Sequence, residues 1–244
     1  MVDSRQVQSR RADTGAVLFA LVLPTLVTLA YFVLMAGYSS QAQQTTYSIG
    51  KGIQFLFPIV WVLAFQRCRP RWKGPKLGEL LEGLAFGALV LVATLLLYHG
   101  WLKPHGYFDE PGAEIQKKVM GFGADTLAKY VLLGTFYALC HSFLEEYYWR
   151  WFVFGQLRRL VSFPTALVVA SLGFMAHHVL VLATFFGWDN PATWLFSAAV
   201  AVGGVVWGWM VERHGSLWGP WISHLLVDAA IFAIGYDLVR HLLG

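Results

Sequence analysis

The sequence predicts an all-α protein that crosses a membrane seven or eight times around an intramembrane polar cavity. Of its 244 residues, 57% are hydrophobic and only 13% are charged, and the mean hydropathy is +0.55. A soluble domain usually carries about 25% charged residues. The composition therefore excludes an ordinary soluble enzyme, a nucleic-acid-binding domain and a disordered chain. The second observation is the regular alternation of long apolar stretches with charged or Gly/Pro-rich breaks.

The apolar stretches predict seven spans, because about 20 helical residues cross a hydrocarbon core of about 30 Å. These spans are 15–37, 52–66, 78–100, 127–150, 164–186, 192–211 and 217–240. The second is short and contains Pro58. The last becomes two helices if it breaks near Gly235, which would raise the count to eight. The charged segment 101–126 is the one sizeable loop, and we expect an interfacial or short amphipathic element there.

The basic residues predict the orientation of these spans. With the N-terminus inside, twelve of the 18 Lys and Arg residues face the cytoplasm and six face the other side. Cytoplasmic loops of membrane proteins carry an excess of Lys and Arg. The twelve are Arg5, Arg10, Arg11, Arg67, Arg69, Arg71, Lys73, Lys76, Arg150, Arg158, Arg159 and Arg213. We expect a multi-pass protein in the plasma or inner membrane of a prokaryote, with a cytoplasmic N-terminus.

Ionisable residues gather in the second half of the chain. Each one inside a span costs about 2.5–3.5 kcal/mol on insertion scales, which makes it a candidate functional residue. The candidates, with one aromatic neighbour, are His141, Glu145, Glu146 and Arg150 in the fourth span, Phe174, His177 and His178 in the fifth, and His224 and Asp228 in the last. Neighbouring residues point about 100° apart around a helix. We therefore expect only one member of each adjacent pair, Glu145–Glu146 and His177–His178, to face a common site.

These residue types suit two kinds of hydrolytic site. A buried carboxylate can act as the general base that activates water, and neutral imidazole can donate to a developing oxyanion. Two histidines and a carboxylate can instead bind a catalytic zinc ion. The linear His-Glu-x-x-His pattern of soluble zinc proteases is absent. Both alternatives stay open, and the two cysteines lie in no CxxC context that would add a metal site.

Three ordered motifs resemble those of the CPBP family, the CAAX-processing and bacteriocin-processing intramembrane endopeptidases, also called Abi. The motifs are Glu145-Glu146-Tyr-Tyr-Trp-Arg150, Phe174-Met-Ala-His-His178 and His224-Leu-Leu-Val-Asp228. The chain is similar in this respect to type II CAAX prenyl proteases. The resemblance covers about residues 130–232. We therefore expect catalytic membrane helices in residues 127–244 and N-terminal spans and a loop in residues 1–126, within one integral membrane domain.

The resemblance implies hydrolysis of a peptide bond near the C-terminus of a membrane-associated peptide or protein, prenylated or not. Glu145 and His178 would activate water, while His224 and Asp228 would stabilise the tetrahedral intermediate. Eukaryotic relatives commonly have Asn where this chain has Asp228, and a carboxylate donates a hydrogen bond only when protonated. Asp228 would, however, suit a metal together with Glu145, His178 and His224. The expected cofactor is therefore either zinc or none, and the expected partners are the substrate and the lipid bilayer, without nucleic acid.

Supporting roles and rival functions complete the prediction. Glu146 is expected to pair with Arg150, His177 to serve the packing of helices, and His141 to orient Glu145. Chains of intramembrane Glu, Asp and His also mark transporters and proton relays. The inverted repeats that would favour a transporter are not visible in the sequence. A third alternative is a non-catalytic immunity or binding protein of the same fold.

Overall fold

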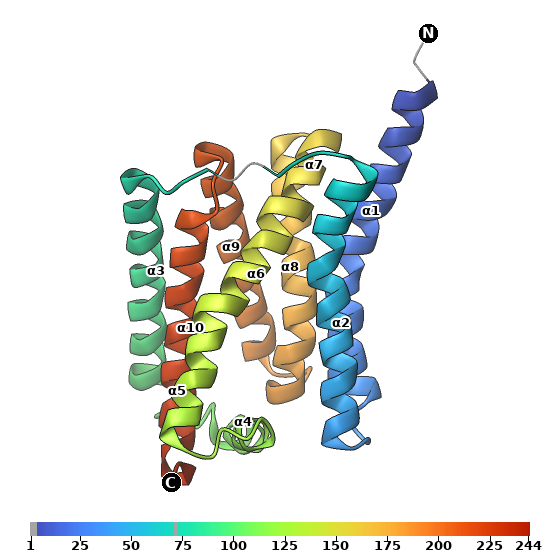
Figure 1. The fold of residues 1–244 in the computed structure, drawn as a ribbon. Coiled ribbons are helices and arrows are strands. Elements are labelled where there is room, and N and C mark those ends of the chain that lie inside the picture. Colours follow the sequence, from blue (N-terminus) through green and yellow to red (C-terminus); the bar gives the residue numbers. More distant parts are fainter. Residues whose placement is uncertain (1–3, 71–72) are drawn as a thin grey trace. The chain divides into compact units, whose positions relative to one another are not determined.

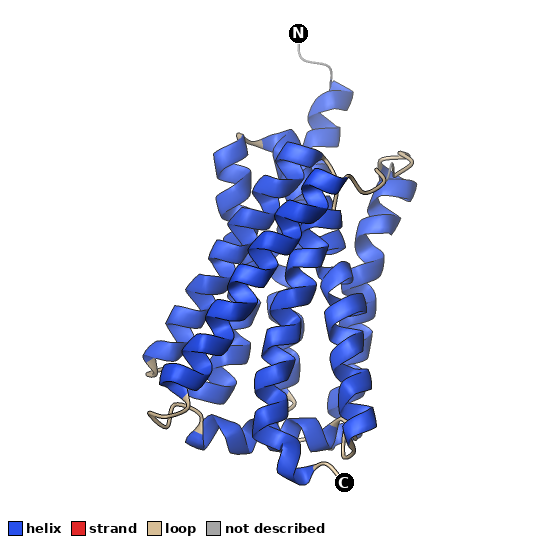
Figure 2. Ribbon diagram, turned by 90° about the vertical axis from the view of Figure 1, so that its left-hand side faces the viewer, coloured by secondary structure: helices blue, strands red, loops and turns tan. Residues whose placement is uncertain are grey.

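The computed structural model describes residues 4–70 and 73–244, and every regular element in those residues is a helix (Figure 2). Seven helices in the described ranges are long and apolar enough to cross a membrane, which confirms the all-α, multi-pass prediction. They are Arg10–Leu34, Ser40–Phe65, Leu77–Leu102, Leu127–Leu160, Phe163–Phe186, Pro191–His214 and Trp218–Leu242. Among the twelve basic residues predicted to face the cytoplasm, Arg71 and the side chain of Arg5 lie outside the part of the chain that the structure describes.

The chain divides into two compact units, each built from two separate stretches. Unit 1 combines residues 1–73 with 147–213, and unit 2 combines residues 74–146 with 214–244. The elements of unit 1 are α1 (Ser4–Leu29), η1 (Ala30–Leu34), α2 (Ser40–Val60), η2 (Trp61–Phe65), η5 (Tyr147–Phe154), α7 (Gly155–Leu160), α8 (Phe163–Phe186) and α9 (Pro191–His214). Those of unit 2 are α3 (Leu77–Leu97), η3 (Tyr98–Leu102), α4 (Asp109–Gly121), α5 (Leu127–Phe136), η4 (Tyr137–His141), α6 (Ser142–Glu146), α10 (Trp218–Val239) and η6 (Arg240–Leu242).

In unit 1, α1 packs against α2 and α8. Within the helix bundle, the Tyr148 hydroxyl donates a buried hydrogen bond of 2.7 Å to the Ala20 carbonyl. A polar network joins one end of α1 to η2 and α7. The amide of Gln66 donates to Asp13 and to Gln156, both at 2.8 Å, and Arg159 donates to Gln156 at 3.0 Å. These contacts fix the end of the segment that carries η5.

In unit 2, α10 packs along α3, and the two helices lie side by side in Figure 1. Small residues make this packing close. A Cβ atom on Gly83 would lie 2.2 Å from the Gly219 carbonyl oxygen, and one on Gly87 would lie 2.8 Å from the Ser223 Cα atom. Small residues let the backbones of membrane helices approach in this way. The far end of α10 meets α4, where the Gln116 amide donates to the Leu238 carbonyl at 2.9 Å.

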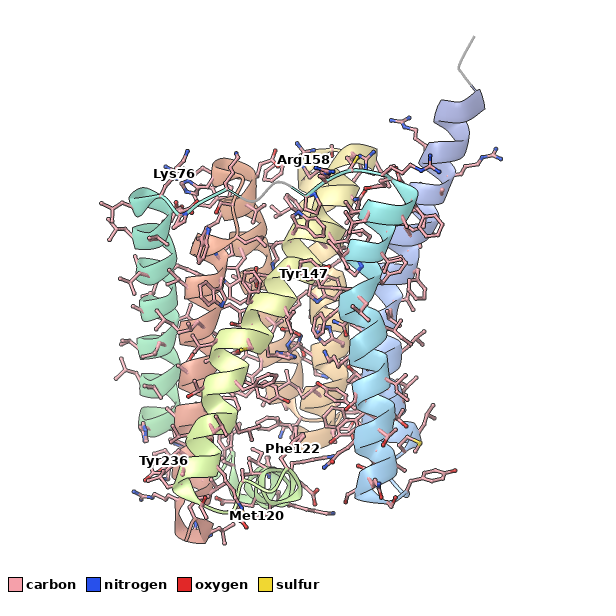
Figure 3. All side chains as sticks on the ribbon, viewed as in Figure 1. Lys76, Met120, Phe122, Tyr147, Arg158 and Tyr236 are labelled. Atoms are coloured by element: carbon pink, nitrogen blue, oxygen red, sulfur yellow. The ribbon has the colours of Figure 1, made fainter. Side chains whose placement is uncertain are left out.

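Two of the predicted span boundaries are wrong. The second span starts at Ser40 rather than at residue 52, because the polar residues before it already form helix behind an N-terminal cap, in which Ser39 Oγ accepts from the Ala42 amide. The fourth span continues to Leu160 rather than ending at Arg150. Accordingly, Figure 3 shows Arg158 near the end of this helix and Tyr147 about half-way along it. The last helix runs through Gly235 without a break, so the described residues contain seven candidate spans, the lower of the two predicted counts.

Four of the described spans contain π-helical stretches, in which a backbone amide donates to the carbonyl five residues earlier. Examples are the bonds from Gln66 to Trp61 at 3.0 Å and from Lys103 to Tyr98 at 2.9 Å. The fourth span contains two such stretches, η4 and η5, and α6 lies between them. Such stretches frequently occur at functional sites. The short helix α6 carries both carboxylates of the first motif.

Candidate active site

In unit 2, three carboxylates from α6 and α10 surround one imidazole ring, that of His224. The Nδ1 atom of His224 lies 2.7 Å from Glu146 Oε1, which is a buried hydrogen bond. A carboxylate accepts, so Nδ1 carries the proton and donates. The other ring nitrogen, Nε2, lies 3.8 Å from Glu145 Oε2 and 3.7 Å from Asp228 Oδ1. Glu145, Glu146 and His224 are 3%, 0% and 4% exposed.

The contact between α3 and α10 holds this ring in position. Ser223, directly before His224, is fully buried, and its backbone faces Gly87 of α3. Gly219, one turn earlier, meets Gly83. Asp228 follows His224 by four residues and so lies on the same face of α10. The packing of α10 therefore positions both members of the third motif.

His141 lies beside the first carboxylate. Its Nε2 atom is 3.9 Å from Glu145 Oε1, which is longer than a hydrogen bond. The ring of His141 packs against Tyr137, with the ring centres 4.9 Å apart. His141 is the last residue of the π-helical turn η4. Because a π-helical turn changes the winding of the helix, it sets the side of the helix on which His141 and Glu145 lie.

In unit 1, α8 carries the second motif. The Nδ1 atom of His178 lies 2.9 Å from the Phe174 carbonyl oxygen. Since a carbonyl only accepts, this bond places a proton on Nδ1 and, in the neutral ring, leaves the lone pair on Nε2. The Phe174 ring packs edge-on against His178 at 4.7 Å. His177 instead stacks on Trp149 of η5, with ring centres 5.7 Å apart and planes 2° from parallel.

Arg150 of η5 is buried between two aromatic rings. Its Cζ atom lies 4.3 Å from the centre of the Phe174 ring and 4.8 Å from that of Trp207 on α9. These distances are typical of cation–π contacts. The contacts explain why Arg150 does not end the fourth span. The sequence interpretation missed Trp149 and Trp207, although both are tryptophans well inside a span rather than at its ends, where the aromatic belt lies.

The positions of Glu145 and Glu146 contradict one prediction from the sequence. The sequence predicted that only one of Glu145 and Glu146 would face a common site, yet both lie against His224. The two nitrogens of an imidazole lie on different edges of the ring, so side chains about 100° apart on one helix can approach both edges. The predicted ion pair between Glu146 and Arg150 stays a prediction.

The predicted site residues thus fall into two sets. The structure brings His141, Glu145, Glu146, His224 and Asp228 together in unit 2 and Arg150, Phe174, His177 and His178 together in unit 1. Among the residues that the structure describes, no group of three or more His, Cys, Asp or Glu side chains is arranged as a set of metal ligands. The expected cofactor, zinc or none, stays a prediction.

The comparison with known families covers all three motifs. Residues 127–230 match the family described as Type II CAAX prenyl endopeptidase Rce1-like. The matched region is similar to this family and covers less than half of the chain. This match confirms the family resemblance that the motifs indicated, and it supports a membrane-embedded endopeptidase of the CAAX type. Searches of the curated proteins and of the solved structures found no match.

Proposed function

We propose that this protein hydrolyses a peptide bond near the C-terminus of a membrane-associated peptide or protein, using a water molecule activated by Glu145. The observation that carries the proposal is the buried His224 ring with Glu145, Glu146 and Asp228 around it. Three carboxylates and an imidazole are expensive to bury in a membrane protein unless they serve a function. The Rce1-like match over the same residues indicates which function that is.

In the proposed reaction, Glu145 takes a proton from water as the oxygen attacks the scissile carbonyl. His178 assists through Nε2, which carries the lone pair because Nδ1 donates to Phe174. The carbonyl becomes a tetrahedral oxyanion, and the proton held by Glu145 passes to the leaving amine as the C–N bond breaks. That His178 acts on the same water as Glu145 is part of the proposal. It is based on the roles that the family motifs imply for these two residues.

His224 serves as the oxyanion donor in this scheme. When the ring carries both protons, Nδ1–H donates to Glu146 and Nε2–H is available to the oxyanion. Glu146 is then a positioning residue that fixes the orientation of the ring. Asp228 lies 3.7 Å from the same Nε2 atom and, when protonated, adds a second donor. The proposed reaction proceeds without a metal ion.

The first test is Glu145→Gln, which keeps the shape of the side chain but removes the base. Cleavage of a CAAX peptide by the purified protein should fall about 10²–10⁴-fold, the usual value of a positioned general base. Prenylated and unprenylated forms of the peptide should be compared, since the residues of the site do not determine whether the substrate carries a lipid. Glu114→Gln is the matched control, because Glu114 is exposed on α4 and forms an ion pair with the equally exposed Lys117 at 3.9 Å.

The role of Glu146 has its own signature. Glu146→Gln retains an oxygen that can accept from His224 Nδ1, whereas Glu146→Leu does not. We expect the Leu variant to lose much more activity than the Gln variant.

Turnover near the wild-type value in well-expressed Glu145→Gln protein would defeat the protease assignment at this site. Solute uptake by proteoliposomes, in protein that cleaves no peptide, would instead favour a transporter.

A further inference from the structure

Four exposed arginines at one end of unit 1 lack an acidic partner within the described part of the chain. Arg10 and Arg11 lie near the start of α1, and Arg67 and Arg69 lie in the loop that follows η2. None of their side chains forms an ion pair or a hydrogen bond with another described residue. We call these four residues the arginine surface.

A buried carboxylate brings the two pairs of arginines to the same end of the unit. Asp13, two residues after Arg11, accepts hydrogen bonds from the Trp61 indole at 3.3 Å and from the Gln66 amide at 2.8 Å. Gln66 directly precedes Arg67. The contact therefore joins the part of α1 that carries one pair to the segment that leads into the other pair.

The acidic residues of unit 1 are engaged elsewhere or lie far away. Asp13 is 7% exposed and also lies 3.5 Å from Arg159. Glu212 accepts from Arg158 at 2.8 and 3.0 Å. The third acidic residue described in this unit, Asp189, follows α8, which has 24 residues and so extends about 36 Å from its start beside α7. No described acidic side chain of unit 1 is therefore left to neutralise the arginine surface.

The backbone at Arg67 indicates that the side chain has a role of its own. Its φ is +53°, and in the described part of the chain it is the one residue other than glycine with a positive φ. It directly follows Gln66, the C-cap of η2. Glycine usually takes this left-handed conformation after a C-cap, because a Cβ atom makes it unfavourable. The turn itself favours glycine and so does not account for an arginine.

The arginine surface lies where two candidate spans end. The first span begins at Arg10, and the second ends at Phe65, two residues before Arg67. Leu63 and Phe65 are 50% and 67% exposed, as expected for side chains that face lipid. The arginines directly adjoin this apolar surface, so we expect them at the level of the lipid headgroups.

We propose that the arginine surface binds the phosphate groups of anionic phospholipid headgroups. A guanidinium donates two parallel hydrogen bonds to a phosphate and keeps its charge at physiological pH. Clusters of about four or more basic residues beside a membrane span are typical of sites for anionic lipids, which give the cytoplasmic leaflet its negative potential. That leaflet is on the side predicted for these arginines. The inference is independent of the proposed protease function.

The test compares phosphatidylglycerol with phosphatidylcholine of the same acyl chains. Each lipid is titrated into the purified protein in a neutral detergent, and the rise in melting temperature gives an apparent Kd. Both lipids carry a phosphate, but only phosphatidylglycerol has a net negative charge. We expect its apparent Kd to be lower by at least about 10-fold, because each arginine near an anionic surface contributes on the order of 5-fold in affinity. High salt should remove most of the difference.

Variants that remove charge locate the site. Arg10→Gln combined with Arg11→Gln should reduce the preference for phosphatidylglycerol at least about 10-fold, and so should Arg67→Gln combined with Arg69→Gln. Loss in both double variants is expected because a headgroup phosphate bound between the two pairs would contact α1 and the loop after η2 together.

Lys117 and Lys129 provide the matched control. Both are exposed cations of unit 2, but each already lies beside a carboxylate, Lys117 at 3.9 Å from Glu114 and Lys129 at 2.6 Å from Asp125. Lys117→Gln combined with Lys129→Gln removes the same net charge as either arginine double variant. It should leave the lipid preference unchanged.

Arg67→Gly separates lipid binding from folding. The substitution removes the side chain and gives the turn the residue that its φ favours. Without added lipid, we expect this variant to melt at or above the wild-type temperature. It should nevertheless lose several-fold of the preference for phosphatidylglycerol.

Equal apparent Kd values for the two lipids at low salt would overturn the proposal. A preference that the arginine variants keep, or that the lysine control loses to the same extent, would also overturn it. Inorganic phosphate and a polyglutamate peptide are titrated in parallel. Stabilisation by either of them, with no preference between the two lipids, would assign the arginine surface to a soluble anion or an acidic protein and refute the lipid.

Discussion

Gly83→Ala should damage the active site without altering any residue in it. The added Cβ atom would lie 2.2 Å from the Gly219 carbonyl oxygen and 2.8 Å from two further backbone atoms of Gly219. Real Cβ contacts are essentially never shorter than 3.0 Å. Backbone atoms cannot rotate away as the end of a side chain can. The helices α3 and α10 must therefore separate locally by at least about 0.8 Å, the difference between these two distances.

This displacement reaches the site along α10. His224 follows Gly219 by five residues, which is about 7.5 Å along a helix. If the shift lies along the hydrogen bond from His224 to Glu146, its 2.7 Å lengthens to about 3.5 Å, where little of the bond remains. Overpacking of this kind costs about 1–3 kcal/mol, and a misplacement of about 1 Å costs on the order of 10²-fold in rate. We expect a lower melting temperature and about 10²-fold slower cleavage.

The matched control is Gly78→Ala, which adds the same methyl group to the same helix. A Cβ atom on Gly78 would have no neighbour within 4 Å. Both variants replace a glycine of α3 by alanine, and of the two only the alanine at position 83 would meet α10. The measurements are thermal unfolding in detergent and peptide cleavage. Gly83→Ala protein that melts and cleaves like the Gly78→Ala protein would refute the close helix contact, and with it the account of how His224 is positioned.

Three further predictions follow from other parts of the chain. Gln54→Met should raise stability by about 1–3 kcal/mol in a detergent unfolding assay, because the fully buried Gln54 amide has no hydrogen-bond partner in the described residues. A less stable Met variant would show that the amide is satisfied. Exhaustive chelation should leave peptide cleavage intact, and a loss that zinc reverses would establish a metal-dependent mechanism. A reporter fused after Lys73 or Arg159 should locate to the cytoplasm and one within residues 101–126 to the opposite side. Cytoplasmic access to the 101–126 segment would reverse the orientation inferred from the basic residues.

The sequence predicted the spans well because apolar length is a direct requirement of the bilayer. It failed where a polar residue is tolerated for a reason that only tertiary structure supplies. Arg150 suggested the end of a helix, yet the rings of Phe174 and Trp207 accommodate its charge and the helix continues to Leu160. The polar first turns of the second span were similarly missed, since a hydropathy pattern does not detect a cap such as Ser39.

The candidate site was predictable as a set of residues but not as a set of contacts. Motif order and helical spacing singled out Glu145, His224 and Asp228, because ionisable groups are rare inside spans. The hydrogen bond between Glu146 and His224 was not predictable, since it depends on the distance between α6 and α10. The small residues Gly83 and Gly87 set that approach from a third helix, and nothing in the motifs refers to them.

The two π-helical turns beside α6 make the fourth span sensitive to a kind of mutation that substitution scanning never samples. Each π turn holds one residue more than the α-helical turn it replaces. Deleting a single residue in Tyr137–His141 would let the helix wind as ordinary α-helix and remain unbroken. Everything beyond the deletion would then turn by about 100° relative to α5. Glu145 and Glu146 would keep their identity while facing a different neighbour, so the orientation of the two carboxylates depends on the number of residues in the turn as well as on their type.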